Sequence, residues 1–260
     1  MLMKKKRPIL FSVLFVFYLL TFMNSCVDKD MESSFGEEAI TRAVVEDSLE
    51  SKYYKILPGS SEWAELNNVE EMYEVSQLTQ EQLEELSTSE LVEACIDFPL
   101  ALNYLFFTNE KEAISDMINN FNGLSELARR NDGASELLKA YDEMVFSDEV
   151  YERKGYNSFW GGLLGYCELL LTDTLFLNSL SESEISEFRR IAKDKYGMKL
   201  EHPEYFGLHA IKRSLMVCAE LALLNEYAYP KTDADILHGY ISFYKLYSPE
   251  GLDRIIELVI

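Results

Sequence analysis

Two acids inside an apolar segment are the first residues that could do chemistry. Glu168 and Asp173 interrupt the Leu-rich segment from Ser158 to Leu180. Glycosidases use a pair of carboxylates in a dry setting as acid and base, so hydrolysis by these two acids is one hypothesis. Their spacing of five residues places them on different sides of a helix. Each carboxylate could instead face solvent or pair with an arginine such as Arg189 or Arg190.

The three histidines of the chain are His202, His209 and His238, and none has the HExxH spacing of a metalloprotease. His209 and Arg213 would share a helix face, with Glu220 two turns further on. This trio could be an acid–base or anion-binding cluster, or a hydrogen-bonded or solvated face without a ligand. No nucleophile elbow, P-loop, Rossmann glycine pattern or EF-hand loop occurs, so the sequence predicts no metal and no cofactor.

Three tyrosines form an aromatic stripe at helical spacing: Tyr240, Tyr244 and Tyr247. With Ile236 and Ile241 nearby, the stripe indicates core packing. If the rings are exposed, they could instead stack on a sugar or a peptide.

The elements that position these residues are expected to be helices. Ser87-x-x-Glu90 and Ser181-x-x-Glu184 are capping boxes, in which each serine and glutamate satisfies an orphan amide. No segment alternates with hairpin turns, so strands should be few or absent. The fold class is therefore all-α, a compact multi-helix domain of roughly eight to ten helices, with stacked helix pairs left open.

The helix boundaries follow from capping and breaking residues. In the first half we expect a helix behind Ser60/Ser61 that carries Trp63 to Tyr73, a short helix after Thr79, a helix from Leu91 to Phe98 before Pro99, a helix from Asn109 that Asn122-Gly123 ends, and a helix capped by Asp132. In the second half we expect helices from Ser158 to Leu180, from Ser181 with Gly197 as C-cap, from Gly207 to Tyr227, from Asp233 to Leu246, and from Glu250 to Val259 behind Ser248-Pro249. Leu215 to Ala219 is apolar nearly all round, which indicates that Gly207 to Tyr227 is a central, buried helix.

The start of the chain has the pattern of a secretory signal. Lys4 to Arg7 are basic, and the 16 residues from Pro8 to Met23 carry no charge. This apolar run is shorter than the ~20 residues that a spanning helix needs. A basic start, a short apolar run and a small residue before the cut site predict a signal peptide over residues 1–25.

The end of that segment, Met23-Asn24-Ser25-Cys26, resembles the lipobox of bacterial lipoproteins. In that family the cysteine after a small residue is acylated and becomes the mature N-terminus, so the resemblance implies a lipid anchor on Cys26. Each buried CH₂ contributes ~0.8 kcal/mol, and two or three acyl chains hold a protein in the bilayer. The alternative is a secreted protein in which Cys26 is incidental.

The acidic residues from Asp28 to Glu32 resemble the surface-export signal of Bacteroidetes lipoproteins. That resemblance implies an outer-membrane lipoprotein that faces the cell surface. A solvated tether facing the periplasm is the alternative.

The charge balance excludes some partners. The chain has 45 Asp and Glu against 24 Lys and Arg, and loss of the four basic residues of the signal peptide leaves 20. The net charge of the mature chain, −25, argues against nucleic acid and anionic lipid as partners. No Lys or Arg occurs between Ile56 and Glu110, where twelve acids lie. This segment is a solvated face or a docking surface for a basic partner or Ca²⁺.

Three cysteines remain besides Cys26: Cys95, Cys167 and Cys218. Each lies among apolar residues, which predicts buried free thiols. A disulfide between two of them is left open, and the sequence selects no pair.

The domain organisation follows from the same signals. Residues 26–57 are polar and weakly patterned and are expected to form a lipidated tether. Residues 58–260 are expected to form a single helical domain, and a sub-boundary near residues 146–157 is left open.

Residues 58–141 resemble a family of uncharacterised Bacteroidetes lipoproteins through PGSSEWAELNNVEEMYEVSQLT, TSELVEACIDFPL and FNGLSELARRNDGASELLKAY. The resemblance implies the compartment and a helical fold, and no activity. Together the sequence favours a membrane-anchored, non-enzymatic binding module for a protein or glycan. The alternatives are a carboxylate-dependent envelope hydrolase and a structural envelope protein.

Overall fold

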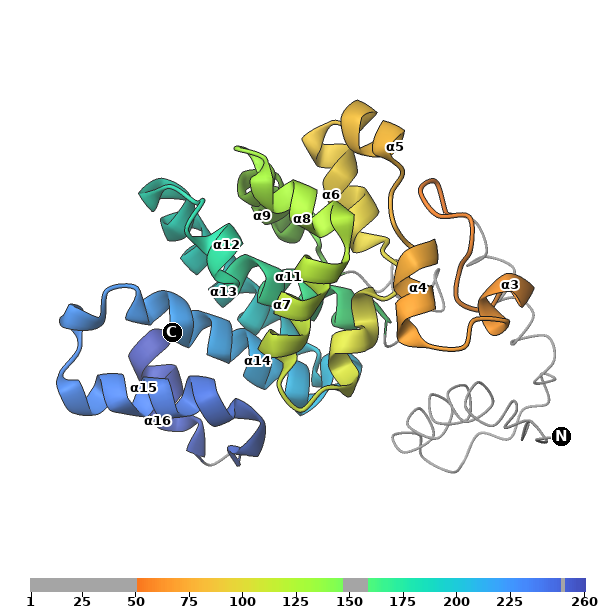
Figure 1. The fold of residues 1–260 in the computed structure, drawn as a ribbon. Coiled ribbons are helices and arrows are strands. Elements are labelled where there is room, and N and C mark those ends of the chain that lie inside the picture. The colour runs from red at the N-terminus through yellow and green to blue at the C-terminus, as the bar shows by residue number, and fades with distance from the viewer. Residues whose placement is uncertain (1–50, 147–158, 249–250) are drawn as a thin grey trace, which may run out of the picture. The chain divides into compact units, whose positions relative to one another are not determined.

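The computed structural model describes residues 51–146, 159–248 and 251–260, and every regular element in these ranges is a helix (Figure 1). The predicted all-α fold class is confirmed. Residues 1–25, Cys26 and the acidic segment behind it lie outside the described residues, as does most of the expected sub-boundary at 146–157. No helix of the described ranges is both long and apolar enough to cross a membrane.

The elements in chain order are α3 (Ser61–Ala64), α4 (Val69–Val75), α5 (Gln80–Glu85), α6 (Thr88–Ile96), the 3₁₀ helix η2 (Ala101–Phe106), α7 (Glu110–Asn120), α8 (Asn122–Arg129), α9 (Gly133–Glu143), α11 (Phe159–Thr172), α12 (Thr174–Leu177), α13 (Glu182–Glu201), α14 (Pro203–Leu223), η3 (Glu226–Ala228), α15 (Lys231–Phe243), η4 (Tyr244–Leu246) and α16 (Asp253–Val259).

The described chain divides into two compact units. The first contains Ile56–Asn67 with α3, and the second contains Ser51–Lys55 and Asn68–Ile260. The expected tether over 26–57 was therefore wrong for Ser51–Lys55. Tyr54 is 4% exposed, and its hydroxyl donates to the Ala94 carbonyl at 2.7 Å, which fixes this segment on α6.

The expected helix from Trp63 to Tyr73 is two helices. The Ser60 hydroxyl caps α3 by accepting a hydrogen bond from the Trp63 amide at 3.1 Å, as predicted, but α3 ends after one turn. A new cap follows at Asn68, whose side chain accepts from the Glu71 amide at 2.9 Å. Asparagine side chains compete with the helix for backbone groups, so Asn68 begins a second helix, α4.

Local capping signals located most of the other helix starts. The capping boxes Ser87–Glu90 and Ser181–Glu184 are both formed, at the starts of α6 and α13. Asp132 holds the N-cap position of α9, but its side chain accepts a hydrogen bond from the Thr88 hydroxyl instead of capping the helix.

The prediction that Asn122-Gly123 ends a helix through positive φ was wrong. The α7 helix ends at Asn120, and Asn122 begins α8. The Asn122 side chain bonds both backbone groups of Leu78, at 3.0 and 2.7 Å. A Cβ at Gly123 would lie 2.4 Å from the Phe121 ring, so glycine is needed there for close packing.

The Ser158 to Leu180 segment is likewise interrupted. The α11 helix ends at Thr172, whose hydroxyl donates to the carbonyls of Glu168 and Leu169, both at 3.1 Å. Asp173 then caps α12 by accepting from the Leu175 amide at 3.0 Å. Two consecutive side chains that bind the backbone explain the break.

Gly197 is not a C-cap, because α13 continues through it to Glu201. Tyr196 and Lys199 are buried on either side of this glycine, so packing extends the helix. It ends at His202, which precedes Pro203 and has non-helical φ and ψ of −130° and 54°. A residue before proline disfavours the helical region.

The α14 helix is the centre of the second unit and packs against α11, α13, α15, α16 and η4. Leu215, Met216, Val217 and Ala219 are fully buried, which confirms the predicted central helix. Gly207 has φ of 69° and separates a first turn from the regular helix, which ends at Leu223 rather than Tyr227. Each buried leucine or methionine stabilises the fold by ~1.5–3 kcal/mol.

The last helix begins later than expected. The α16 helix starts at Asp253 behind Leu252, without a side-chain cap, so Ser248 does not cap it. Pro249 and Glu250 lie outside the described residues.

Candidate functional site

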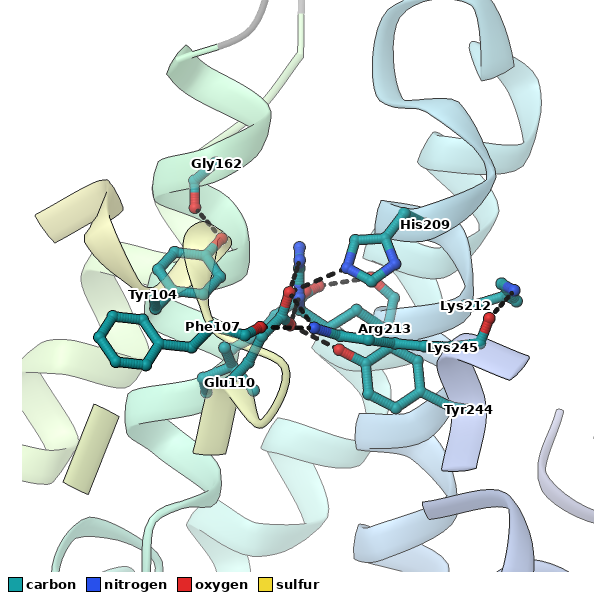
Figure 2. Close-up of polar contacts among 12 residues, drawn as sticks. Tyr104, Phe107, Glu110, Gly162, His209, Lys212, Arg213, Tyr244 and Lys245 are labelled. Atoms are coloured by element: carbon teal, nitrogen blue, oxygen red, sulfur yellow. Dashed lines mark hydrogen bonds and ion pairs between the residues drawn. The ribbon is translucent and has the colours of Figure 1, made fainter. Parts of the chain in front are cut away.

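A buried carboxylate, Glu110, is the polar centre of the region where α7, α14 and η4 meet (Figure 2). It is the first residue of α7, directly behind Asn109, whose side chain accepts from the Glu112 amide at 3.3 Å. Glu110 is 3% exposed. A buried carboxylate needs donors or cations around it, and these come from distant parts of the chain.

Two of the donors are on α14. Arg213 donates from Nε to Glu110 Oε2 at 2.8 Å and from Nη2 to Oε1 at 3.0 Å, which is a bidentate pair. His209 Nε2 lies 2.9 Å from Oε1. The structure thus brings His209 and Arg213 together, as their spacing predicted, around a carboxylate that the sequence analysis did not include.

Two further donors are on η4. The Tyr244 hydroxyl donates to Glu110 Oε2 at 2.5 Å, and Lys245 Nζ lies 3.1 Å from Oε1. A carboxylate offers about four lone-pair sites, so these contacts and those from α14 satisfy it completely. We call Glu110, His209, Arg213, Tyr244 and Lys245 the Glu110 cluster.

The electrostatics of this cluster keep the carboxylate ionised. Burial acts to raise the pKa of Glu110, but hydrogen bonds from His209, Arg213 and Tyr244 outweigh it and hold the pKa well below its usual range. Burial disfavours the charge on Arg213, yet Tyr104 and Glu110 keep its pKa above the ordinary value. With Arg213 and Lys245 charged, the cluster has a surplus positive charge even when His209 is neutral.

One side of the cluster reaches solvent. The side chains of His209 and Lys245 are 43% and 27% exposed. Lys245 Nζ also donates to the Phe107 carbonyl at 3.1 Å, while the Phe107 ring points away from the cluster (Figure 2). Phe107 and Leu246 are 50% and 81% exposed. We call Phe107, His209, Lys245 and Leu246 the exposed edge.

Neighbouring groups hold the cluster in place. Lys212 Nζ donates to the carbonyls of Lys245 and Tyr247, both at 2.9 Å, and so fixes η4 on α14. The Arg213 guanidinium carbon lies 5.2 Å from the Tyr104 ring centroid. A Cβ at Gly165 would lie 2.4 Å from Arg213 Nη1, so only glycine fits beside it.

Glu168, the first candidate acid, is the centre of a second buried cluster. Lys199 Nζ donates to both of its oxygens, at 2.8 and 3.0 Å. The Ser214 hydroxyl at 2.5 Å and the Tyr141 hydroxyl at 3.0 Å complete its contacts. Glu168 and Lys199 are both fully buried, so the expected solvent exposure or arginine partner was wrong. Burial lowers the pKa of Lys199 despite the carboxylate beside it.

Asp173 and Glu220 lie apart from these clusters. Asp173 caps α12 and accepts a hydrogen bond from the Ser115 hydroxyl at 3.0 Å. Glu220 forms an ion pair with Lys111 rather than joining His209. Burial raises the pKa of Glu220. The structure therefore does not bring the two candidate acids of the apolar segment, or the whole predicted trio, into one site.

The tyrosine stripe is mainly packed inside. Tyr240 is fully buried, and its hydroxyl donates to the Lys212 carbonyl at 2.8 Å. Its ring packs edge-on against Tyr247 at 5.0 Å between centroids, and Tyr244 is bound to Glu110. Tyr240 and Tyr244 therefore present no ring for a ligand to stack on.

A pocket of about 330 Å³ lies elsewhere, between α13, α14, η3 and α16. Arg189 and Lys193 of α13 line one side of it. Apolar residues such as Leu221, Ala222 and Leu258 line most of the rest, together with Asn225 and Tyr229, and no Asp or Glu side chain does.

Metal and thiol chemistry find no support in the described part of the chain. No group of three or more His, Cys, Asp or Glu side chains there could hold a metal ion. The free thiols of Cys95, Cys167 and Cys218 are all buried, and no disulfide joins them. Burial raises the pKa of Cys167 and Cys218 to about 12, so neither is a nucleophile at neutral pH.

Two residues of the buried clusters were not predicted from the sequence. Glu110 follows a helix cap, where an acid normally faces solvent and favours the helix dipole, so its sequence context gave no signal. Lys199 did leave a signal. Phe188, Ala192, Lys195 and Lys199 lie at helical spacing on the buried face of α13, and a lysine in register with apolar residues indicates a buried cation.

No protein-family model, curated protein or solved structure matches the chain. The assignment of function therefore depends on the sequence signals and on the geometry above.

Proposed function

We propose that the chain is a lipid-anchored envelope lipoprotein whose helical domain binds a protein or glycan at the outer-membrane surface without catalysing a reaction. The observation that carries the binding role is the exposed edge. Phe107, whose carbonyl accepts a hydrogen bond from Lys245, and Leu246, the next residue of η4, are both exposed there, and the His209 side chain is half-exposed. Exposed apolar groups beside fixed polar groups are typical of recognition surfaces.

The geometry gives less support to the hydrolase alternative. A general acid must reach its substrate, but Glu168 is fully buried and bound by Lys199. Glu110 is equally enclosed and is held ionised by its donors. The pocket beside α13 has cations and apolar side chains without an acid.

The anchor is supported by sequence alone. The basic start, the apolar run up to Met23 and the lipobox-like Ser25-Cys26 favour acylation of Cys26. The acids from Asp28 to Glu32 favour export to the cell surface. The family resemblance over residues 58–141 agrees with this compartment.

The test is a binding screen with the full-length lipidated chain in lipid nanodiscs, on glycan and peptide arrays. The variant Phe107→Ser/Leu246→Ser should lose at least about tenfold in affinity for any ligand found, since exposed apolar anchors contribute ~1.4 kcal/mol or more to such sites. The matched control is Leu175→Ser on α12, a leucine 54% exposed that should leave binding unchanged. Equal binding by all three proteins would remove the exposed edge from the proposal, and turnover of an array substrate would replace it with an enzyme.

A further inference from the structure

The pocket between α13, α14 and α16 differs in charge from the chain around it. The whole chain has a net charge of −21, yet the only charged side chains that line this pocket are Arg189 and Lys193. The two are four residues apart on α13 and share one face of that helix.

Neither cation is paired with an Asp or Glu side chain in the described ranges. Arg189 uses Nε to donate to the Leu221 carbonyl at 3.1 Å, which leaves its two Nη groups for other acceptors. Lys193 Nζ donates to the main-chain oxygen of Ile260, the last residue of the sequence, at 3.3 Å. The adjacent Arg190 differs, because it contacts Glu187 and Asp194 at 2.7 and 2.5 Å.

The rest of the pocket is largely apolar. Leu221, Val259 and Cys218 form its buried part, with exposures of 0, 6 and 5%. The Cys218 thiol stays protonated and behaves as a small hydrophobe. Asn225 adds one neutral amide. A ligand that fits must therefore combine an anionic end with an apolar body.

We propose that this pocket binds a small amphiphilic carboxylate, with its anionic group between Arg189 and Lys193 and its aliphatic chain against Leu221 and neighbouring apolar side chains. A guanidinium binds a carboxylate through paired hydrogen bonds. The volume of about 330 Å³ lies at the lower end of the ~300–1,000 Å³ range of ligand sites, which favours a small molecule.

The charge of the whole chain also selects for a monoanion. The field of a strongly acidic protein repels a ligand in proportion to the charge of that ligand, so polyphosphates and other polyanions are disfavoured. A single carboxylate meets the local cations at the smallest cost in long-range repulsion. This site goes beyond the proposed function, because it requires neither the exposed edge nor a macromolecular partner.

The test is calorimetric titration of the full-length chain in lipid nanodiscs with sodium hexanoate. Hexylammonium chloride and 1-hexanol are the matched probes of opposite and zero charge, and empty nanodiscs give the background. Hexanoate should bind with one site per chain, and the other two probes should bind at least about tenfold more weakly. Equal binding of all three, or no hexanoate binding above the background, would overturn the proposal.

Variants locate the site. Lys193→Gln should weaken hexanoate binding about fivefold or more, and Ala222→Phe, which fills the pocket, should abolish it. Arg190→Gln removes the same charge from the next residue of α13 after Arg189, where the arginine pairs with acids, and should leave binding unchanged. Circular dichroism of each variant verifies the fold. If Arg190→Gln weakens binding as much as Lys193→Gln, the effect is one of net charge and the pocket is not the site. Phe107→Ser/Leu246→Ser should bind hexanoate normally, which separates this proposal from the proposed function.

Discussion

Lys199 donates hydrogen bonds to both oxygens of Glu168 at 2.8 and 3.0 Å, and neither side chain is exposed to solvent. The two residues come from α13 and α11, which both pack on α14. In this position the two charged groups have lost their contacts with water. They are contacted instead by each other, by two hydroxyl groups and by apolar side chains. Removing one partner and removing both partners should therefore change the free energy of unfolding by different amounts, and this difference is measurable.

Removal of one partner should be costly. We expect Glu168→Gln or Lys199→Met to lower the free energy of unfolding by ~3–5 kcal/mol, because an uncompensated buried charge remains. The double variant Glu168→Leu/Lys199→Met should be destabilised less than the sum of the single variants. Urea denaturation followed by circular dichroism measures all three.

The exposed pair of Glu187 and Arg190 is the matched control for that experiment. Its 2.7 Å contact lies at the surface, where ion pairs contribute ~0–1 kcal/mol. Glu187→Gln should therefore hardly change the unfolding transition. A small effect of both Glu168→Gln and Glu187→Gln would mean that the interior pair is accessible to water.

The Glu110 cluster should give acid-dependent stability. Because hydrogen bonds hold the folded-state pKa of Glu110 below the ordinary value of 4.5, its contribution is present above pH 4.5 and is lost as the pH falls towards the folded-state pKa. We expect the stability difference between the native chain and Glu110→Gln to be largest near neutral pH and to shrink below about pH 4.5. Thermal unfolding from pH 7 to pH 3 measures it, and a difference independent of pH would contradict the assignment.

The buried thiols should be protected in the folded protein. Cys95 and Cys167 are fully buried and Cys218 nearly so, and the raised pKa of Cys167 and Cys218, about 12, keeps both protonated. Iodoacetamide at pH 8 should label these cysteines slowly in the native chain and completely in 6 M guanidinium. Rapid native labelling of Cys218 alone, read by peptide mass spectrometry, would show that the pocket opens further than the structure indicates.

Some of these residues could be predicted from the sequence and others could not. The difference is how far apart in the chain the interacting residues lie. The Ser87–Glu90 and Ser181–Glu184 capping boxes join atoms three residues apart, so their spacing in the chain predicts them. The Glu110–Arg213 pair joins residues 103 positions apart, and the residues next to Glu110 in the sequence do not indicate its partner. His209 and Arg213 were found as a pair because they share one helix face.

The helix ends that were predicted wrongly show the same dependence on packing at shorter range. Apolar periodicity runs through Thr172 and Asp173, but both side chains bond nearby backbone groups and end α11. Gly197 was predicted to end a helix, but α13 continues past it because Lys199 is buried beyond it. Periodicity reports which face is buried, whereas the choice between a side-chain and a backbone acceptor depends on packing that the pattern does not contain.

Acylation of the anchor has its own prediction. Cells fed a palmitate analogue should label the native chain and not Cys26→Ser, since the thiol is the acylated atom in bacterial lipoproteins. Ser25→Ala keeps a small residue before Cys26 and is the matched control that should stay labelled. Label on Cys26→Ser would contradict the assignment of Cys26.

The most direct test of the central claim, a lipid-anchored domain at the cell surface, is protease shaving of intact cells that produce the native chain. A blot against the helical domain follows the result, with Cys26→Ser as the unanchored control and a periplasmic protein as the control for leakage. The account predicts that protease removes the native domain from intact cells while the periplasmic protein survives. Survival of the native domain until the outer membrane is opened would contradict surface exposure and place the domain on the periplasmic side.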